Sequence, residues 1–190
     1  MSFQGGSVMA VSDIANRQNK IGWGIFALSA LGLECAALFF QYAMGLEPCI
    51  MCVYQRLAVA GVLFTSIIGF LASRNFWGQI FAHGLMVYAT GEGLMVAKEH
   101  VEMQSGDSFF FACEFVPNFP SWMPLHEWFP GVFAATGDCG EISWQFFDMS
   151  MPEWMVVVFT GYMVAQVLML AWVVGDHVDR VNGRKRRHSA

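Results

Sequence analysis

The chain contains 190 residues, of which 56% are apolar and only 13% are charged, and its mean hydropathy is +0.47. Because a soluble domain carries about 25% charged residues, this composition excludes an ordinary water-soluble domain and predicts an integral membrane protein surrounded by membrane lipid. The net charge of −5 says little until the charges are placed along the chain, and we expect no nucleic-acid partner.

The first predicted element is a membrane-spanning helix near the start of the chain. Residues 1–20 are polar and are expected to form a short disordered tail, whereas residues 21–43 are apolar apart from Glu34 and Gln41. An apolar run of about 20 residues is long enough to cross a bilayer as a helix. Basic residues before an apolar run also occur in cleaved signal peptides, but this run is too long for the core of one. We therefore predict an uncleaved first helix.

Three further apolar runs are predicted to span the membrane, and they cover residues 57–72, 77–97 and 154–174. Four spans place both termini on one side of the membrane. The predicted fold is therefore an all-α integral membrane protein, with a four-transmembrane-helix bundle over residues 21–175 and a basic tail over residues 176–190.

Lysine and arginine are distributed unevenly between the two sides of this predicted bundle. Eight of the ten lie in the two tails or in the short turn at Arg74, while only Arg56 and Lys98 lie on the side of the predicted loops, residues 44–56 and 98–153. Cytoplasmic segments carry an excess of these residues. We therefore predict cytoplasmic termini and loops that face an outer, oxidising compartment, where disulfides form and persist.

Two cysteines three positions apart lie in the first of these loops. The sequence there reads Glu47-Pro48-Cys49-Ile50-Met51-Cys52-Val53-Tyr54-Gln55-Arg56, and proline is favourable as the first residue of a helix. If a helix begins at Pro48, then Cys49 and Cys52 lie on one face in its first turn, and Arg56 follows one turn later. The helix dipole and a nearby guanidinium both stabilise a thiolate. The pattern therefore favours a thiol–disulfide redox site.

A Cys-x-x-Cys pair has other uses as well. It can supply half of a zinc site, but structural zinc takes four ligands, and the sequence holds no second Cys-x-x-Cys and no His-x-x-x-His pattern. Attachment of a c-type haem requires His directly after the second cysteine, where this chain has Val53. Two buried, unreactive cysteines are a further alternative, although Glu47, Pro48 and Arg56 indicate a polar boundary. We therefore predict redox chemistry and no metal site.

A second candidate pair, Cys113 and Cys139, lies in the long loop and encloses positions 114–138. A structural disulfide here would stabilise the loop by about 3–4 kcal/mol. The enclosed residues 119–129 are rich in aromatic residues and proline, which is typical of a segment lying on the membrane surface or of an interfacial aromatic belt. Such a segment would hold the loop cysteines within reach of Cys49 and Cys52.

Several other residues receive no role from the sequence. Glu34 is costly to bury in a membrane and is a functional candidate by default, but a structural partner on a neighbouring helix explains it equally well. His83 and Glu92 in the third run pose the same question. Cys35 is expected to be an inert small residue on a helix face, and His126 is expected to be an interfacial loop residue.

Taken together, the motifs resemble the bacterial disulfide bond formation protein B (DsbB) family over roughly residues 22–175. The residues that carry the resemblance are Glu34, Pro48-Cys49-x-x-Cys52-x-x-x-Arg56, Glu99-His100, Phe119-Pro120-x-Trp122-x-Pro124-Leu125, Gly137-Asp138-Cys139, Trp144 and Met151-Pro152-x-Trp154. Each motif alone is weak, but their order and spacing together are specific. The resemblance implies a bundle in the bacterial inner membrane, with cytoplasmic termini and periplasmic cysteine loops.

The resemblance also implies a function. Members of the family reoxidise a periplasmic thioredoxin-like thiol oxidase of the DsbA type and pass the electrons to ubiquinone or menaquinone. Carried over to this sequence, Cys113 is expected to form the mixed disulfide with the reduced partner. Cys139 is then expected to attack Cys49, and the released Cys52 thiolate is expected to contact the quinone ring.

The quinone pocket implied by the resemblance includes two further residues. Arg56 is expected to lie beside the quinone and support the thiolate, and His100 is expected to line the same pocket, whereas Gln55 receives no role. Two alternatives stay open. The chain could serve one dedicated thioredoxin-like partner, or it could be a non-catalytic membrane protein whose cysteines form structural disulfides or bind a soft metal.

Overall fold

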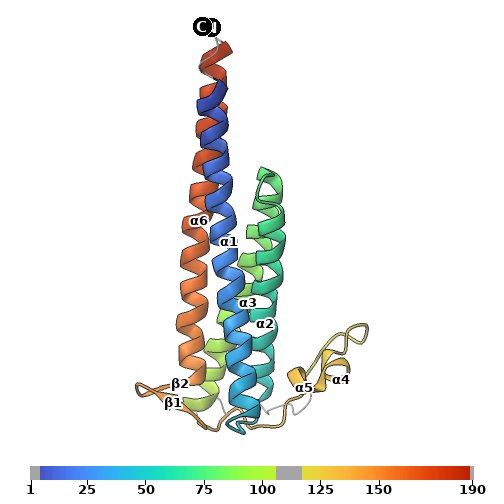
Figure 1. Cartoon of the computed structure of the whole chain (residues 1–190). Coiled ribbons are helices and arrows are strands. Elements are labelled where there is room, and N and C mark those ends of the chain that lie inside the picture. Colours follow the sequence, from blue (N-terminus) through green and yellow to red (C-terminus); the bar gives the residue numbers. More distant parts are fainter. Residues whose placement is uncertain (1–4, 106–116, 189–190) are drawn as a thin grey trace.

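Four long helices run along one another and form an elongated bundle (Figure 1), in a computed structural model that describes residues 5–105 and 117–188. They are α1 (Gly5–Tyr42), α2 (Ile50–Leu71), α3 (Phe76–Ser105) and α6 (Met151–His188). Each contains an apolar stretch long enough to cross a membrane. The prediction of a helical membrane protein with four spans is therefore confirmed.

The helices pack in sequence around the bundle. Helix α1 packs on α2, α2 on α3, and α3 on α6, whereas α1 and α6 are in limited contact. The start of α1 and the end of α6 lie at one end of the bundle, which we call the terminal end (Figure 1). The segments that carry Cys49 and Cys139 lie at the opposite end, which we call the loop end. Helices α2 and α3 are joined by a short turn, residues 72–75, that faces the terminal end.

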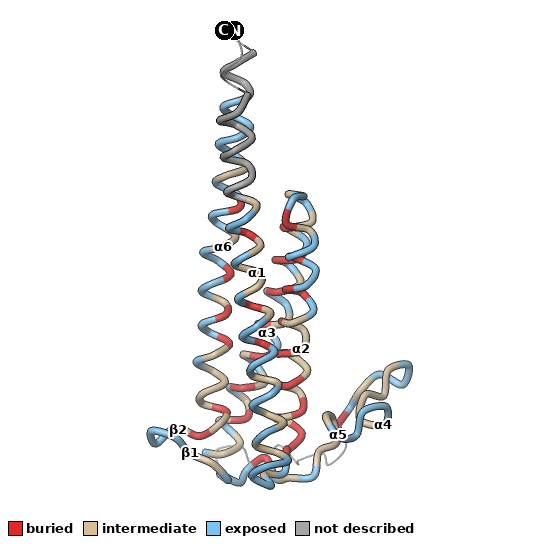
Figure 2. Tube along the Cα trace, in the orientation of Figure 1, coloured by how far each residue is buried: buried red, intermediate tan, exposed pale blue. Residues whose placement is uncertain are grey.

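Large side chains fill the space between the helices. Trp23, Met86 and Phe159 are fully buried, and buried residues mark the inward side of each helix (Figure 2). The outward sides are apolar as well, because Phe64 is 68% and Leu168 is 67% exposed within the protein. A surface of this kind is stable only in contact with lipid, since water would not tolerate so many exposed apolar side chains.

Both terminal helices are longer than their apolar runs predicted. Helix α1 begins at Gly5, so the expectation of a disordered tail over residues 1–20 is wrong from that residue on, and α6 continues to His188. A helix that is already nucleated adds residues at little cost. The chain offers no proline that would end α1 between Gly5 and Tyr42.

The two inner helices also extend beyond their predicted apolar runs at the loop end. Helix α2 begins at Ile50 instead of residue 57, and α3 continues to Ser105 instead of ending at residue 97. The added residues of α3 include Lys98, Glu99 and Gln104, which are good helix formers although they are polar. The hydropathy pattern therefore identified these two spans correctly but underestimated the length of both helices.

The described part of the connection between α3 and α6, residues 117–150, contains four short elements. They are α4 (Leu125–Trp128), α5 (Pro130–Phe133), β1 (Gln145–Phe146) and β2 (Met149–Ser150). The strands pair as an antiparallel hairpin whose two turn residues, Phe147 and Asp148, have φ angles of 51° and 57°. A two-residue turn with positive φ at both positions usually contains Asn or Gly. The all-α prediction missed this hairpin because the sequence there lacks that signal.

An aromatic segment, residues 119–129, extends away from the bundle at the loop end (Figure 1). Trp122 is 73% exposed, and Trp128 and Phe129 are each 57% exposed. His126 lies in this segment and stacks on Phe119. Exposed aromatic rings are typical of a segment that lies on a membrane surface. The placement of residues 119–129 on the membrane stays a prediction.

Candidate functional site

Cys49 caps the N-terminus of α2. Its backbone is extended, with φ −80° and ψ 172°, and its sulfur accepts a hydrogen bond from the backbone N–H of Cys52 at 3.3 Å. The thiol thus takes the place of the oxygen that usually caps a helix. Pro48 lies outside the helix, so the prediction that it is the first helical residue is wrong. Cys49 and Cys52 still lie together at the first turn, as predicted.

A backbone contact joins the two cysteine-bearing segments. The N–H groups of Thr136 and Gly137 both donate to the carbonyl oxygen of Pro48, at 2.9 and 3.1 Å. A Cβ atom on Gly137 would lie only 2.4 Å from the carbonyl oxygen of Glu47, so this approach requires glycine. The contact, which we call the loop clamp, brings the following Cys139 against Cys49.

Three sulfur atoms meet at the loop clamp. The Sγ atoms of Cys49 and Cys52 lie 3.0 Å apart, and the Cys49 thiol donates a hydrogen bond to the Cys52 sulfur. Hydrogen bonds with the thiols of Cys139 and Cys52, together with burial, raise the pKa of Cys49, which therefore stays protonated at neutral pH. Cys113, the predicted partner of Cys139, lies outside the described residues.

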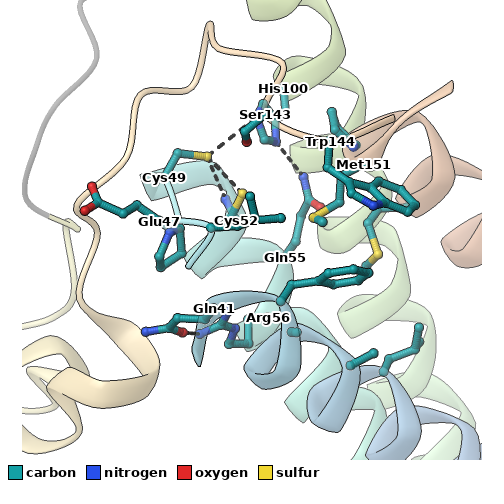
Figure 3. A pocket seen from close by; sticks show the side chains of 18 of the residues that line it. Gln41, Glu47, Cys49, Cys52, Gln55, Arg56, His100, Ser143, Trp144 and Met151 are labelled. Atoms are coloured by element: carbon teal, nitrogen blue, oxygen red, sulfur yellow. Dashed lines mark hydrogen bonds between the residues drawn. The ribbon is translucent and has the colours of Figure 1, made fainter. Parts of the chain in front are cut away.

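His100 joins this cluster from α3. Its Nε2 atom lies 3.5 Å from the Cys49 sulfur, and its Nδ1 atom accepts a hydrogen bond from the Gln55 side chain at 3.1 Å (Figure 3). With Nδ1 occupied as an acceptor, the ring proton resides on Nε2 and points at the sulfur. Gln55 received no role from the sequence. Its position three residues after Cys52, on the same helix face, is the signal that could have indicated one.

We predict that Gln55→Leu lowers the free energy of unfolding by about 1–3 kcal/mol, because the buried Nδ1 atom of His100 loses its donor. Gln55→Glu reverses the bond instead, since a carboxylate accepts from Nδ1–H and leaves Nε2 without its proton. Chemical denaturation in detergent measures the first effect, and nitrogen NMR shifts of the imidazole measure the second. A His100 tautomer that is the same in wild type and in Gln55→Glu would contradict the orienting role of Gln55.

Arg56 is only 7% exposed and holds the loop end together. Its Nη1 atom donates to the Gln41 side-chain oxygen of α1 at 2.8 Å and to the backbone oxygen of Val132 in α5 at 2.6 Å. Its Nε atom has no hydrogen-bond partner among the described residues. The structure thus adds a structural role for Arg56 and a supporting role for Gln41, which the sequence could not show because Gln41 lies on a different helix.

A cavity of about 160 Å³ lies beside the cysteines, between α1, α2, α3 and α6. Cys52 and Arg56 line it (Figure 3). Its apolar wall includes Phe40 and Met155. An engineered apolar cavity of about 150 Å³ binds benzene, so this space has room for one six-membered ring. The predicted pocket residues Arg56 and His100 both line it.

The remaining candidates separate clearly by position. Glu34, which the sequence left without a role, lines the same cavity, and its Oε1 atom is buried without a hydrogen-bond partner among the described residues. His83 is buried in the bundle against the Trp23 ring and does not line this cavity. Glu92 and Cys35 are exposed on the outer faces of their helices. Only Glu34 among these belongs to the site.

The cluster also has the composition of a soft-metal site. One ligand atom from each of Cys49, Cys52 and His100 lies within 4.8 Å of the other two. Thiolate and imidazole ligands suit zinc and copper(I). The sequence shows only the Cys-x-x-Cys pair, because the third ligand, His100, belongs to α3 and meets the cysteines only in the folded bundle.

Comparison with known proteins connects this site to one family. A family model described as disulfide bond formation protein DsbB matches residues 19–169. A disulfide bond formation protein B from Pseudoalteromonas atlantica is 49% identical, over 85% of this chain and 93% of its own length. Proteins of the same name from Shewanella sp. (strain ANA-3) and Aeromonas salmonicida are 50% and 45% identical, each over 80% of this chain and 87% of its own length. The chain therefore belongs to the DsbB family of membrane disulfide bond formation proteins.

Proposed function

We propose that this protein is a quinone-dependent thiol oxidase of the bacterial inner membrane that reoxidises a periplasmic, DsbA-like dithiol protein. The distribution of lysine and arginine supports an orientation with cytoplasmic termini and a periplasmic loop end, since eight of the ten basic residues belong to the tails and the turn at Arg74. The loop end then faces the compartment in which disulfides are made.

The observation that carries this proposal is the row of sulfur atoms at the loop clamp. Cys139 lies against Cys49, the Cys49 sulfur lies 3.0 Å from the Cys52 sulfur, and Cys52 lines the cavity. Thiol–disulfide exchange requires a thiolate in contact with a disulfide sulfur. The row therefore offers a path for electrons from the large loop to the cavity without any metal.

Thiol–disulfide exchange along this row of sulfur atoms conserves electrons at every step, because each new disulfide bond replaces one that breaks. A thiolate of the reduced partner attacks Cys113 of a Cys113–Cys139 disulfide, which releases Cys139 as a thiolate. Cys139 then attacks Cys49 of a Cys49–Cys52 disulfide and releases the Cys52 thiolate. The second partner thiol resolves the mixed disulfide with Cys113, and the freed Cys113 then attacks Cys139. The partner leaves oxidised, and its two electrons reside on Cys49 and Cys52, with one proton on the Cys49 thiol and the other released to solvent.

The residues around Cys52 suit the charge that this scheme develops. Cys52 accepts the hydrogen bond of the Cys49 thiol and lies in the first turn of α2, where the helix dipole favours negative charge. The guanidinium of Arg56 lies within electrostatic range of its sulfur. The protonated Cys49 and the charged Cys52 thus have distinct roles, with Cys49 receiving the attack and Cys52 acting as the leaving thiolate.

The cavity suits a quinone as the final electron acceptor. Its volume has room for one ring, and the guanidinium of Arg56, which lines the cavity, supplies N–H donors for a ring carbonyl. A bound quinone accepts two electrons and two protons and leaves as a quinol. The residues of the protein hold the thiolate beside the ring site, while the apolar side chains of α1 and α6 keep water away.

The proposal is tested by an anaerobic assay. Purified protein is mixed with excess ubiquinone and a reduced DsbA-like protein, and quinone absorbance is followed in wild type and in Cys49→Ser, Cys52→Ser, Cys113→Ser and Cys139→Ser. Quinone reduction by wild type and by none of the variants is expected, because each sulfur is one link of the path. Cys35→Ser is the matched control, since Cys35 is exposed on α1 and does not line the cavity, and it should keep wild-type activity.

A non-catalytic metal protein is the second candidate, and the three ligand atoms of Cys49, Cys52 and His100 favour it. Stoichiometric zinc or copper in the purified protein, lost in His100→Ala, together with unreduced quinone in the wild-type assay, would establish that function instead. Reduction of quinone by metal-free protein would exclude it.

A further inference from the structure

A second cavity, of about 380 Å³, lies at the terminal end of the bundle, far from the cysteines along the helices. It is formed by α1, by the turn between α2 and α3, and by the last part of α6. Its lining is mainly polar and includes Asn16, Asn19, Ser73, Arg74, His177 and Arg180. None of these residues belongs to the redox site.

Three residues that line this cavity, Asn16, Asn19 and Ser73, each have a buried side-chain oxygen without a hydrogen-bond partner among the described residues. Two of these residues are themselves buried. Ser73 is 5% and Asn19 is 6% exposed, yet neither the Ser73 hydroxyl nor the Asn19 side-chain oxygen has a hydrogen-bond partner among the described residues. Leaving a buried polar group unpaired costs about 1–3 kcal/mol, and native proteins nearly always satisfy such groups. Both therefore point to a polar ligand in the cavity.

The charge around the cavity is positive. Arg74 has no ion-pair partner among the described residues, whereas Arg180 is paired with Asp176. Helix α3 begins at Phe76, which lines the cavity. Asn75 already accepts from the N–H groups of Trp77 and Gln79, so this helix attracts an anion mainly through its dipole. The ligand that fits is therefore an anion that accepts hydrogen bonds.

The position of the cavity along the bundle indicates the class of anion that it binds. Leu71 and Trp77 flank the turn between α2 and α3 and are 76% and 74% exposed, so this turn lies where lipid chains meet water. Tryptophan is enriched at that boundary, and basic pockets between membrane helices bind the headgroups of anionic phospholipids. We propose that this cavity binds the phosphate of an anionic phospholipid such as phosphatidylglycerol, through Arg74, Ser73 and Asn19.

The test is native mass spectrometry of the full chain, delipidated in detergent and titrated with phosphatidylglycerol. We expect one tightly bound lipid in wild type and about fivefold weaker binding in Arg74→Ala, because one basic side chain near a headgroup contributes about that factor. Ser73→Ala should also weaken binding while leaving the charge unchanged, and Arg74→Lys should restore most of the affinity. The matched control is Arg17→Ala, which removes an exposed charge of α1 that does not line the cavity.

Three results would overturn the proposal. Equal lipid affinity in wild type, Arg74→Ala and Ser73→Ala would show that the cavity is not the binding site. Equal affinity for phosphatidylcholine would show that an anion is not selected. Displacement of the lipid by inorganic phosphate at similar concentration would identify a site for free phosphate instead. Quinone reduction does not depend on lipid binding in this cavity, so Arg74→Ala should reduce quinone at the wild-type rate whichever lipid result is obtained.

Discussion

Gly137→Ala is expected to slow quinone reduction by the reduced partner protein about 100-fold. The added Cβ would lie 2.4 Å from the carbonyl oxygen of Glu47, so the loop clamp must open and the two hydrogen bonds to Pro48 must break. Cys139 then moves away from Cys49, and a displacement of about 1 Å between reacting groups is enough to cost about 100-fold in rate.

The assay can locate this defect within the electron path. Dithiothreitol, a small dithiol, can reduce the Cys49–Cys52 disulfide without the large loop, so quinone reduction driven by dithiothreitol should stay near the wild-type rate in Gly137→Ala. Gly140→Ala is the matched control, because a Cβ there meets only the Asp138 side chain at an ordinary 3.6 Å. A wild-type rate with the partner protein in Gly137→Ala would show that the loop clamp does not position Cys139.

Arg56→Ala is expected to lower kcat/KM for quinone by about 10- to 100-fold, because a hydrogen bond to a charged group is worth about 1.5–3 kcal/mol. The variant loses the guanidinium donors at the cavity wall and a positive charge within electrostatic range of Cys52. Its affinity for the partner protein should fall much less. Stopped-flow measurement of quinone reduction, with partner binding measured separately, checks both statements.

Arg56 also anchors α5, so a second variant must separate its two roles. Gln41→Leu removes one acceptor of the Nη1 atom but keeps the charge, and it should affect quinone kinetics far less than Arg56→Ala. Lys98→Ala removes the other basic residue of the loop end, which is exposed and outside the cavity, and should have no effect. Equal quinone kinetics in Arg56→Ala and wild type would remove Arg56 from the site.

The class of the protein and the chemistry of its best motif were predictable from local sequence. Four apolar runs with polar or charged residues at their ends predict four membrane helices, because only a helix satisfies its own backbone within lipid. The spacing of Cys49 and Cys52 predicts that they are neighbours at one helical turn, which the structure confirms. These predictions succeeded because they depend on residues that are close together in the chain.

Helix ends were less predictable. Hydropathy reports contact with lipid, whereas a helix ends where its capping and hydrogen bonding change. Proline suits the first helical position, but the carbonyl oxygen of Pro48 is bonded to Thr136 and Gly137, and the next residue, Cys49, caps the helix. Nothing local to Pro48 reveals this contact, because its two partners follow two membrane spans later in the chain.

The assembly of the site depends on tertiary packing. The contacts of Cys139 with Cys49, of Gln55 with His100, and of Arg56 with α1 and α5 all join segments that are distant in sequence. Such contacts form because packing the helices brings unpaired polar groups together, and burial makes each of them require a partner. Residue types and spacing can name the reactive groups, but the distances that let them react arise from the packing of the whole bundle.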